Sequence, residues 1–143
     1  MGGICGIVSA DRKSIDGAAD LSPMLQALGY RASGESLSVD AGRAVIGARR
    51  IGNHLATAVE TVVAGKHYAI ACFGSIYNLS QLIGEIGSDS KKGIGLLRLY
   101  LDEDLAFLER LRGEFALAIW DGREERLILA TDRFRVHPLL YSH

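Results

Sequence analysis

The chain has 143 residues, of which 48% are hydrophobic and 23% charged, the size and balance of one globular domain with its own core. Its formal net charge of -1 provides no basic surface for phosphate backbones and argues against nucleic acid as a partner. The longest apolar stretch, residues 115–120, is far short of the roughly 20 residues that cross a bilayer, and no secretory signal opens the chain. We therefore expect a cytoplasmic location, with neither a nucleic acid nor a membrane as partner.

Cysteines and histidines show none of the spacings that are typical of metal sites. Cys5 and Cys72 are too far apart to form a C-x-x-C motif, and a single possible pair does not make a disulfide framework. The four histidines are His54, His67, His137 and His143, and they follow no H-x-x-x-H pattern. The sequence therefore predicts no bound metal.

The first half of the chain reads as a strand, a helix and then a series of strands. An apolar run over residues 4–10 predicts a buried strand, and leucines at intervals of three and four predict a helix over residues 21–30. In that helix Ser22 and Pro23 supply a start signal and Gly29 a stop. Further strands are predicted over residues 36–40, 43–51, 58–63 and 68–73, and the short turns between them favour antiparallel pairing.

The second half begins with helices and ends with strands. Helices are predicted over residues 78–86 and 93–101, followed by an amphipathic segment over residues 105–111. Two strands, 114–120 and 126–130, flank the turn sequence D-G-R-E and predict a hairpin, and a final short strand is expected at 139–141. Strands, then helices, then strands indicate an α+β fold rather than alternating βαβ units.

Four short motifs carry a resemblance to a known family. They are C-G-I-V at residues 5–8, I-Y-N at 76–78, L-R-G-E-F-A-L-A-I-W-D at 111–121 and D-R-F-R-V-H-P-L at 132–139. In order and spacing they resemble C-G-I-V, N-G-E-I-Y-N, L-x-G-M-F-A-F-A-I-W-D and D-R-F-G-I-K-P-L of the class II glutamine amidotransferase domains of asparagine synthetases. The resemblance implies an Ntn-hydrolase fold, a four-layer αββα sandwich of antiparallel sheets. It also implies that residues 1–143 are the N-terminal domain of a larger protein, truncated at the C-terminal end.

The resemblance also implies a catalytic cysteine. In this family a cysteine at the first position of the mature chain attacks the glutamine amide, and its own α-amino group is the nearby base. Carried over, Cys5 is the nucleophile and the backbone N–H of Gly74 is an oxyanion donor. Four residues precede Cys5. Either they are removed after Ile4, or Cys5 is an internal residue without that base, and both alternatives stay open.

The substrate-binding positions are a mixture of kept and altered residues. Arg50 falls where the family places the arginine that clamps the glutamine carboxylate, although the neighbouring Arg49 leaves the register uncertain by one residue. Phe73 stands in place of an asparagine that helps to hold the oxyanion. Lys92 stands in place of the aspartate that binds the substrate amino group, and Asp89 substitutes for it only if the loop shifts by three residues.

Further departures lie at two turns. Residues 31–34 read R-A-S-G where the family has R-G-P-D, so that only the arginine is kept. Arg135 and His137 replace a glycine and a lysine, and we expect the turn that contains them to differ.

Two functions follow from the resemblance. The first is hydrolysis of glutamine to glutamate and ammonia for a C-terminal synthetase domain in asparagine biosynthesis. This domain then needs no cofactor, and ATP and Mg are implied only for the missing partner domain. The second is a catalytically silent domain that supports an amide-forming partner, as in β-lactam synthetases, and Phe73, Lys92 and the four-residue leader favour it. A monomer or a weak homodimer is expected in either case.

Overall fold

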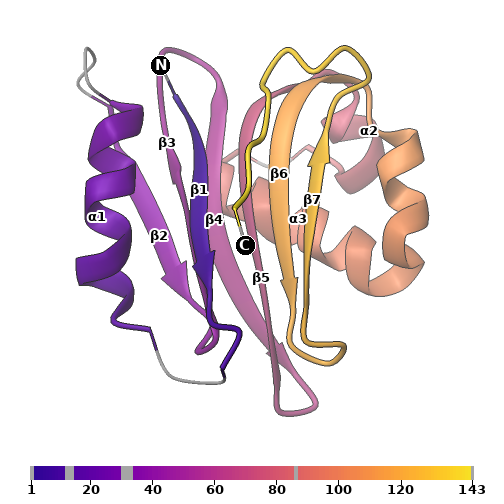
Figure 1. Cartoon of the computed structure of the whole chain (residues 1–143). Coiled ribbons are helices and arrows are strands. Elements are labelled where there is room, and N and C mark those ends of the chain that lie inside the picture. Colours follow the sequence, from indigo (N-terminus) through magenta and orange to yellow (C-terminus); the bar gives the residue numbers. More distant parts are fainter. Residues whose placement is uncertain (1, 12–14, 30–33, 86, 143) are drawn as a thin grey trace.

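Two antiparallel sheets packed face to face form the centre of the computed structural model, which describes residues 2–11, 15–29, 34–85 and 87–142 (Figure 1). Sheet A has the strand order β1-β3-β2 and sheet B the order β4-β5-β6-β7. The strands of sheet A are β1 (Gly3–Val8), β2 (Ser36–Asp40) and β3 (Ala44–Arg49). Those of sheet B are β4 (Leu55–Val63), β5 (Lys66–Ile76), β6 (Gly113–Asp121) and β7 (Arg126–Thr131).

Helices cover the outer face of each sheet. Helix α1 (Gly17–Leu28) lies on sheet A, and Leu21 and Leu25 pack with Val45 of β3. On the far side of sheet B lie α2 (Leu79–Ile83), α3 (Asp89–Glu103) and the 3-10 helix η1 (Asp104–Arg110) (Figure 1). The order of layers is helix, sheet, sheet, helix, which confirms the predicted α+β fold and its αββα sandwich.

Small side chains let the two sheets approach each other. Five alanines in this layer are fully buried: Ala44, Ala48, Ala56, Ala69 and Ala71. Trp120 and Phe73 supply most of the bulk between them, at 2% and 3% exposure. Because the pleat sends alternate residues to opposite faces, the same strands also supply the larger side chains that pack under α3.

Most predicted elements are present, and their ends differ for identifiable reasons. Helix α1 begins at Gly17, before the predicted start, because the carboxylate of Asp16 accepts a hydrogen bond from the N–H of Ala19 and caps it. Helix α3 begins at Asp89 rather than residue 93, since Ser88 is its N-cap. Helix α2 stops early at Gly84, whose φ of 82° ends the helix.

The predicted amphipathic segment after α3 is the 3-10 helix η1. One further prediction needs correction. The predicted strand at residues 139–141 is wrong, because that segment has no strand partner and no regular structure in the described part of the chain. Its apolar residues face solvent, with Leu140 96% exposed.

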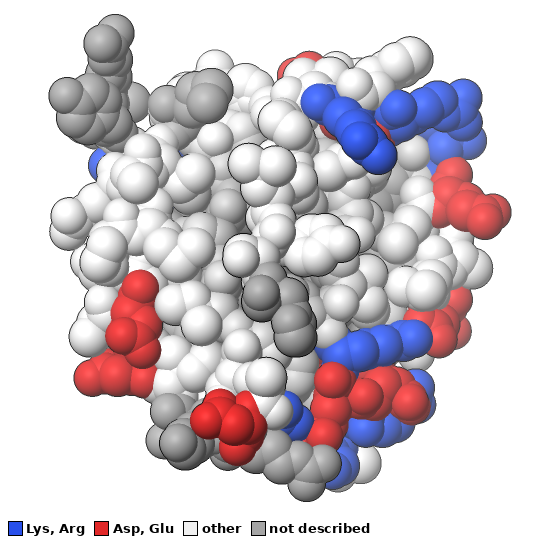
Figure 2. Space-filling view, in the orientation of Figure 1, with Lys and Arg blue, Asp and Glu red and all other residues white. Residues whose placement is uncertain are grey.

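Charged side chains on the face seen in Figure 1 lie toward its edges, and those at the lower left of the view are acidic (Figure 2). The middle of that face lacks charged side chains, and acidic and basic groups are mixed along its right-hand edge (Figure 2). Within the described residues, none of the helices has the length and apolar content needed to span a membrane.

A buried polar network joins α3 to sheet B. The hydroxyl of Tyr100 donates a short hydrogen bond to the carboxylate of Asp121, and Arg126 donates to the same hydroxyl at 2.9 Å. Burial by itself would raise the pKa of Asp121, but hydrogen bonds from Tyr100 and from the N–H groups of Glu124 and Arg123 outweigh it. The pKa of Asp121 therefore lies below its ordinary value of 3.8, and the ionised form stabilises the fold.

We expect Tyr100→Phe to lower the free energy of unfolding at pH 7 by about 1.5 to 3 kcal/mol, because it removes a hydrogen bond to a buried charge. A carboxyl group whose pKa is lowered in the folded state stabilises the fold at pH values above its ordinary pKa. This stabilisation is lost as the pH falls through the lowered pKa. The difference in free energy of unfolding between the variant and the parent should therefore become smaller below pH 3.8. Urea unfolding at pH 7 and below pH 3.8 measures this difference. Tyr77→Phe is the control, since Tyr77 is 71% exposed, and a loss for Tyr100→Phe no larger than for the control contradicts the prediction.

Candidate functional site

The fold brings Arg50 and Asp89 together. Arg50 follows β3 and Asp89 opens α3, and Nη1 of Arg50 lies 2.7 Å from Oδ2 of Asp89. Sequence alone could not decide between two adjacent arginines. Arg49 donates instead to the carbonyl of Leu25 in α1 at 3.2 Å, so Arg50 is the arginine that faces the acid.

Asp89 already has three partners. Besides Arg50, the N–H of Ala56 donates to Oδ2 at 3.3 Å, and Nζ of Lys92 lies 3.4 Å from Oδ1. Arg50 has a second acidic neighbour, with Nη2 at 3.6 Å from Oε2 of Glu35. The side chain of Asp89 is 16% exposed and that of Arg50 33%. The pair is accessible to a small solute, but these internal contacts must open before it binds one.

The thiol of Cys5 faces away from the space between the sheets. Cys5 packs against Leu21, Leu25 and Val45, under α1, whereas the preceding Ile4 packs against Phe73 in the layer between the sheets. Burial raises the pKa of the Cys5 thiol from 9.0 to about 11. The structure thus joins Arg50 with Asp89 but puts the Cys5 thiol on the opposite face of sheet A from Phe73.

Phe73 is buried among aromatic rings. Its ring stacks on that of His54, with centroids 5.4 Å apart and planes 13° apart. The ring of His137 meets it edge-on at 5.0 Å. A phenylalanine side chain provides no hydrogen-bond donor.

Gly74 of β5, paired with Phe115 of β6, has a backbone conformation that side chains rarely allow. Its φ is 131°, and a Cβ atom there would be 2.2 Å from the carbonyl oxygen of Glu114. A side chain is therefore excluded by the neighbouring backbone. Gly74 also lines a cavity of about 280 Å³, together with Lys92 and residues of α2.

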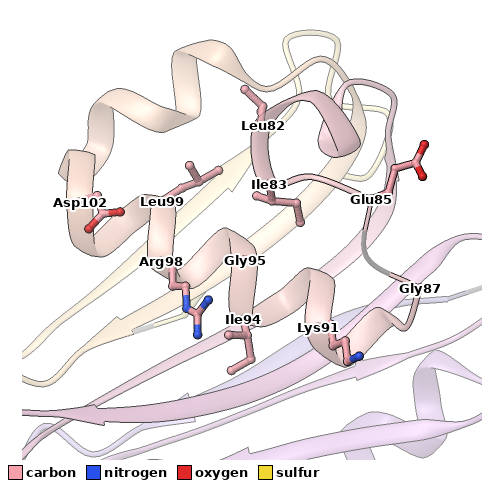
Figure 3. Close-up of a pocket in the computed structure, with 10 residues that line it drawn as sticks. All are labelled: Leu82, Ile83, Glu85, Gly87, Lys91, Ile94, Gly95, Arg98, Leu99 and Asp102. Carbon is pink, nitrogen blue, oxygen red and sulfur yellow. The ribbon is translucent and has the colours of Figure 1, made fainter.

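A larger cavity lies elsewhere. Its volume is about 580 Å³, and it is lined from α2 and α3 by residues such as Ile83, Lys91 and Arg98 (Figure 3). None of the predicted site residues lines it. The volume of a cavity alone therefore does not identify the candidate functional site.

Comparison with known proteins decides the family. The sequence profile of a family described as "Glutamine amidotransferase domain" matches residues 1–143. The chain belongs to the glutamine amidotransferase domain family. The resemblance inferred from the four motifs is confirmed.

The similarity to individual amidotransferase proteins is partial. The chain is 30% identical over 73 residues to asparagine synthetase (glutamine-hydrolyzing) 2 of Bacillus subtilis (strain 168), covering 48% of this chain and 10% of that protein. It is 29% identical over 83 residues to asparagine synthetase B (glutamine-hydrolyzing) of Escherichia coli (strain K12), covering 54% and 15%. Amidase chry2 of Gibberella zeae is 32% identical over 75 residues, covering 48% and 11%. The matches thus span a small share of each relative.

The amidotransferase roles assigned to single residues stay predictions. The structure supplies the ion pair of Arg50 with Asp89 and a backbone at Gly74 that leaves no room for a side chain. It supplies no contact between the Cys5 thiol and Phe73, since the two side chains lie in different layers. Residues 31–33 of the altered R-G-P-D motif lie outside the described residues.

One set of side chains at this site was not found from the sequence. One potential ligand atom each of His54, Glu114 and His137 lies within 4.8 Å of the others, beside Phe73. These residues are far apart in the chain, so no motif spacing could reveal them. Only the pairing of strands in sheet B and the turn after β7 bring them together.

We expect Gly74→Ala to destabilise the amidotransferase domain by at least about 2 kcal/mol, because a left-handed φ costs about 1 to 3 kcal/mol for other residues and backbone atoms cannot move aside. Urea unfolding measures this loss. Gly87→Ala is the matched control, since a Cβ atom there would meet nothing within 4 Å. Equal free energies of unfolding for the two variants would contradict the steric clash expected between a side chain at Gly74 and the backbone of Glu114.

Proposed function

We propose that this amidotransferase domain supports an ATP-dependent, amide-forming partner domain of the asparagine-synthetase type without itself releasing ammonia. ATP and Mg belong to that partner in this proposal. The observation that carries it is the place of Cys5, whose thiol packs under α1 among Leu21, Leu25 and Val45. A nucleophile must reach its substrate, and this side chain faces a helix.

The acidity of the thiol supports the same conclusion. The thiolate is the reactive form of cysteine, and nucleophilic cysteines have their pKa lowered toward neutrality. Burial here raises the pKa of Cys5 to about 11. At neutral pH only about one thiol in ten thousand is ionised at such a pKa. The half-buried Cys5 thiol therefore lacks the acidity of a nucleophilic cysteine.

The oxyanion position gives independent support. By the family resemblance, Phe73 replaces a donor asparagine, and loss of one such donor typically costs about 2.7 to 4 kcal/mol of transition-state stabilisation. Phe73 is also 3% exposed and packed between aromatic rings. In this proposal the phenylalanine ring fills the space that the asparagine side chain would need.

Glutamine hydrolysis is the second candidate, and the pair of Arg50 with Asp89 favours it. A guanidinium beside a carboxylate complements the carboxylate and the ammonium group of a free amino acid. In this reading the four-residue leader is removed, the thiolate of Cys5 attacks the amide carbon, and ammonia leaves. Water then releases glutamate from the thioester.

Alkylation should reveal the raised pKa of Cys5. In a Cys72→Ala variant Cys5 is the single thiol of the chain. At pH 8 we expect iodoacetamide to modify the folded variant about 100-fold more slowly than the same chain in denaturant, because raising a thiol pKa from 9.0 to about 11 lowers the thiolate fraction by that factor. Mass spectrometry follows the reaction. Equal rates in the two states would show that the thiol is neither buried nor shifted.

A glutaminase assay separates the two functions. We expect the chain that begins at Met1 and its Cys5→Ala variant to release glutamate at the same background rate, because an internal Cys5 has no free α-amine to take its proton. The matched sample is a chain processed to begin at Cys5. Glutamate release that depends on Cys5 in either chain contradicts the silent-domain proposal. If only the processed chain shows such release, glutamine hydrolysis after removal of the leader is the function.

A further inference from the structure

Three potential metal ligands meet at one end of sheet B. His54 lies in the turn before β4, Glu114 in β6 and His137 in the segment that follows β7. One ligand atom of each lies within 4.8 Å of the other two. Two imidazoles and a carboxylate are a donor set that Zn²⁺ takes in proteins, where such three-residue sites leave a fourth position to water.

The spacing suits an ion better than it suits a hydrogen bond. Nε2 of His54 and Oε1 of Glu114 are 3.8 Å apart, which is too long for a hydrogen bond. A tetrahedral ion with bonds of about 2.0 to 2.1 Å holds its ligand atoms about 3.3 Å apart. A small inward movement of these side chains would therefore complete the coordination.

His137 also has an unused nitrogen. In the part of the chain that the structure describes, its Nε2 is shielded from solvent and has no hydrogen-bond partner. Buried polar atoms nearly always have a partner, and an orphaned one calls for an explanation such as a missing ion. This observation is independent of the spacing of the three side chains.

A buried carboxylate holds the turn that carries His137. Asp132, 4% exposed, accepts hydrogen bonds from the N–H groups of Phe134 at 2.9 Å and Val136 at 3.1 Å. It also accepts one from Phe115 in β6 at 3.3 Å. The turn is thereby fixed to the strand that carries Glu114, so two of the three ligands share one rigid support.

Phe73 forms the floor under both imidazoles. It stacks on His54 and meets His137 edge-on, and the two imidazole rings are 6.0 Å apart at 84° to each other. Above that floor, the side chains of His54 and Glu114 are 36% and 33% exposed. A metal ion can therefore enter from solvent, and water can reach the fourth position.

We propose that His54, Glu114 and His137 bind one divalent transition-metal ion, for which Zn²⁺ is the natural probe. Mg²⁺ and Ca²⁺ prefer oxygen ligands and suit two imidazoles poorly. The bound ion links the turn before β4, strand β6 and the turn after β7. The inference does not depend on whether the domain hydrolyses glutamine.

Zn²⁺ titration of the tag-free protein, followed by calorimetry with a competing chelator, tests the site. We expect one ion per chain and a higher melting temperature with Zn²⁺, because an ion that binds only the folded state stabilises it. We expect each of three variants to lower the Zn²⁺ affinity at least about tenfold: His54→Ala, His137→Ala and Glu114→Gln. Loss of a residue that only supports a metal ligand already costs about that much.

The control is a second histidine–glutamate pair of equal separation. Nδ1 of His67 lies 3.8 Å from Oε2 of Glu60, and no third ligand joins them in the described residues. The Zn²⁺ affinity of His67→Ala should stay within about twofold of the parent value, a much smaller change than in the ligand variants. Replacing Cys5 and Cys72 together by alanine should do the same, which excludes the thiols as ligands.

The isosteric Glu114→Gln keeps the test valid if a histidine variant fails to fold, and circular dichroism identifies such a failure. Co²⁺ gives a further measurement, since tetrahedral coordination produces a strong visible absorption that solvated Co²⁺ lacks. Zn²⁺ binding that survives both Glu114→Gln and His137→Ala overturns the proposal. So does a folded parent chain that shows no saturable binding.

Discussion

The side chains of β1 alternate between two layers, and this alternation decides what the space between the sheets contains. Cys5 pairs with Gly47 of β3, and a Cβ atom at Gly47 would be 2.9 Å from Leu21 of α1. The helix therefore lies close over this pair, and the Cys5 thiol fills part of the same layer. Ile4 consequently faces Phe73. Turning the thiol inward requires a shift of the strand by one residue, which would expose every apolar side chain that β1 now buries between the sheets.

Patterns that depend on near neighbours in the chain predicted most of the fold. Apolar runs and turn residues located the seven strands, and short turns join three of the neighbouring pairs, β2 with β3, β4 with β5 and β6 with β7. One prediction failed where a contact distant in the sequence decides the outcome, and another where a local cap does. Residues 139–141 have strand-like composition, yet in the described structure no strand edge pairs with them. The start of α1 was missed because Pro23 is a common first-turn residue, whereas here Asp16 caps the helix seven residues earlier.

The candidate site was only partly predictable for a related reason. The family resemblance suggested Arg50 and Asp89, and the fold joins them in an ion pair. The direction of the Cys5 side chain depends on strand register and on α1, which no motif records. The three-ligand cluster was invisible for the same reason. Its histidines are 83 positions apart, as 137 minus 54 gives, and they meet through Asp132, a residue whose structural role is hidden inside a motif.

Phe73 bears on both the proposed function and the proposed metal site. By the family resemblance its position belongs to an asparagine that offers a hydrogen bond to an oxyanion, and such a donor acts best in a preorganised site that excludes water. Here the aromatic ring stacks on His54 and supports His137. Both imidazoles then keep fixed orientations at the edge of sheet B. In the turn that carries His137, Arg135 adopts a φ of 53°, a left-handed conformation that glycine takes more readily. Because Phe73 provides no hydrogen-bond donor and is also the apolar floor on which both histidines rest, the proposed silent oxyanion position and the proposed metal site depend on one residue.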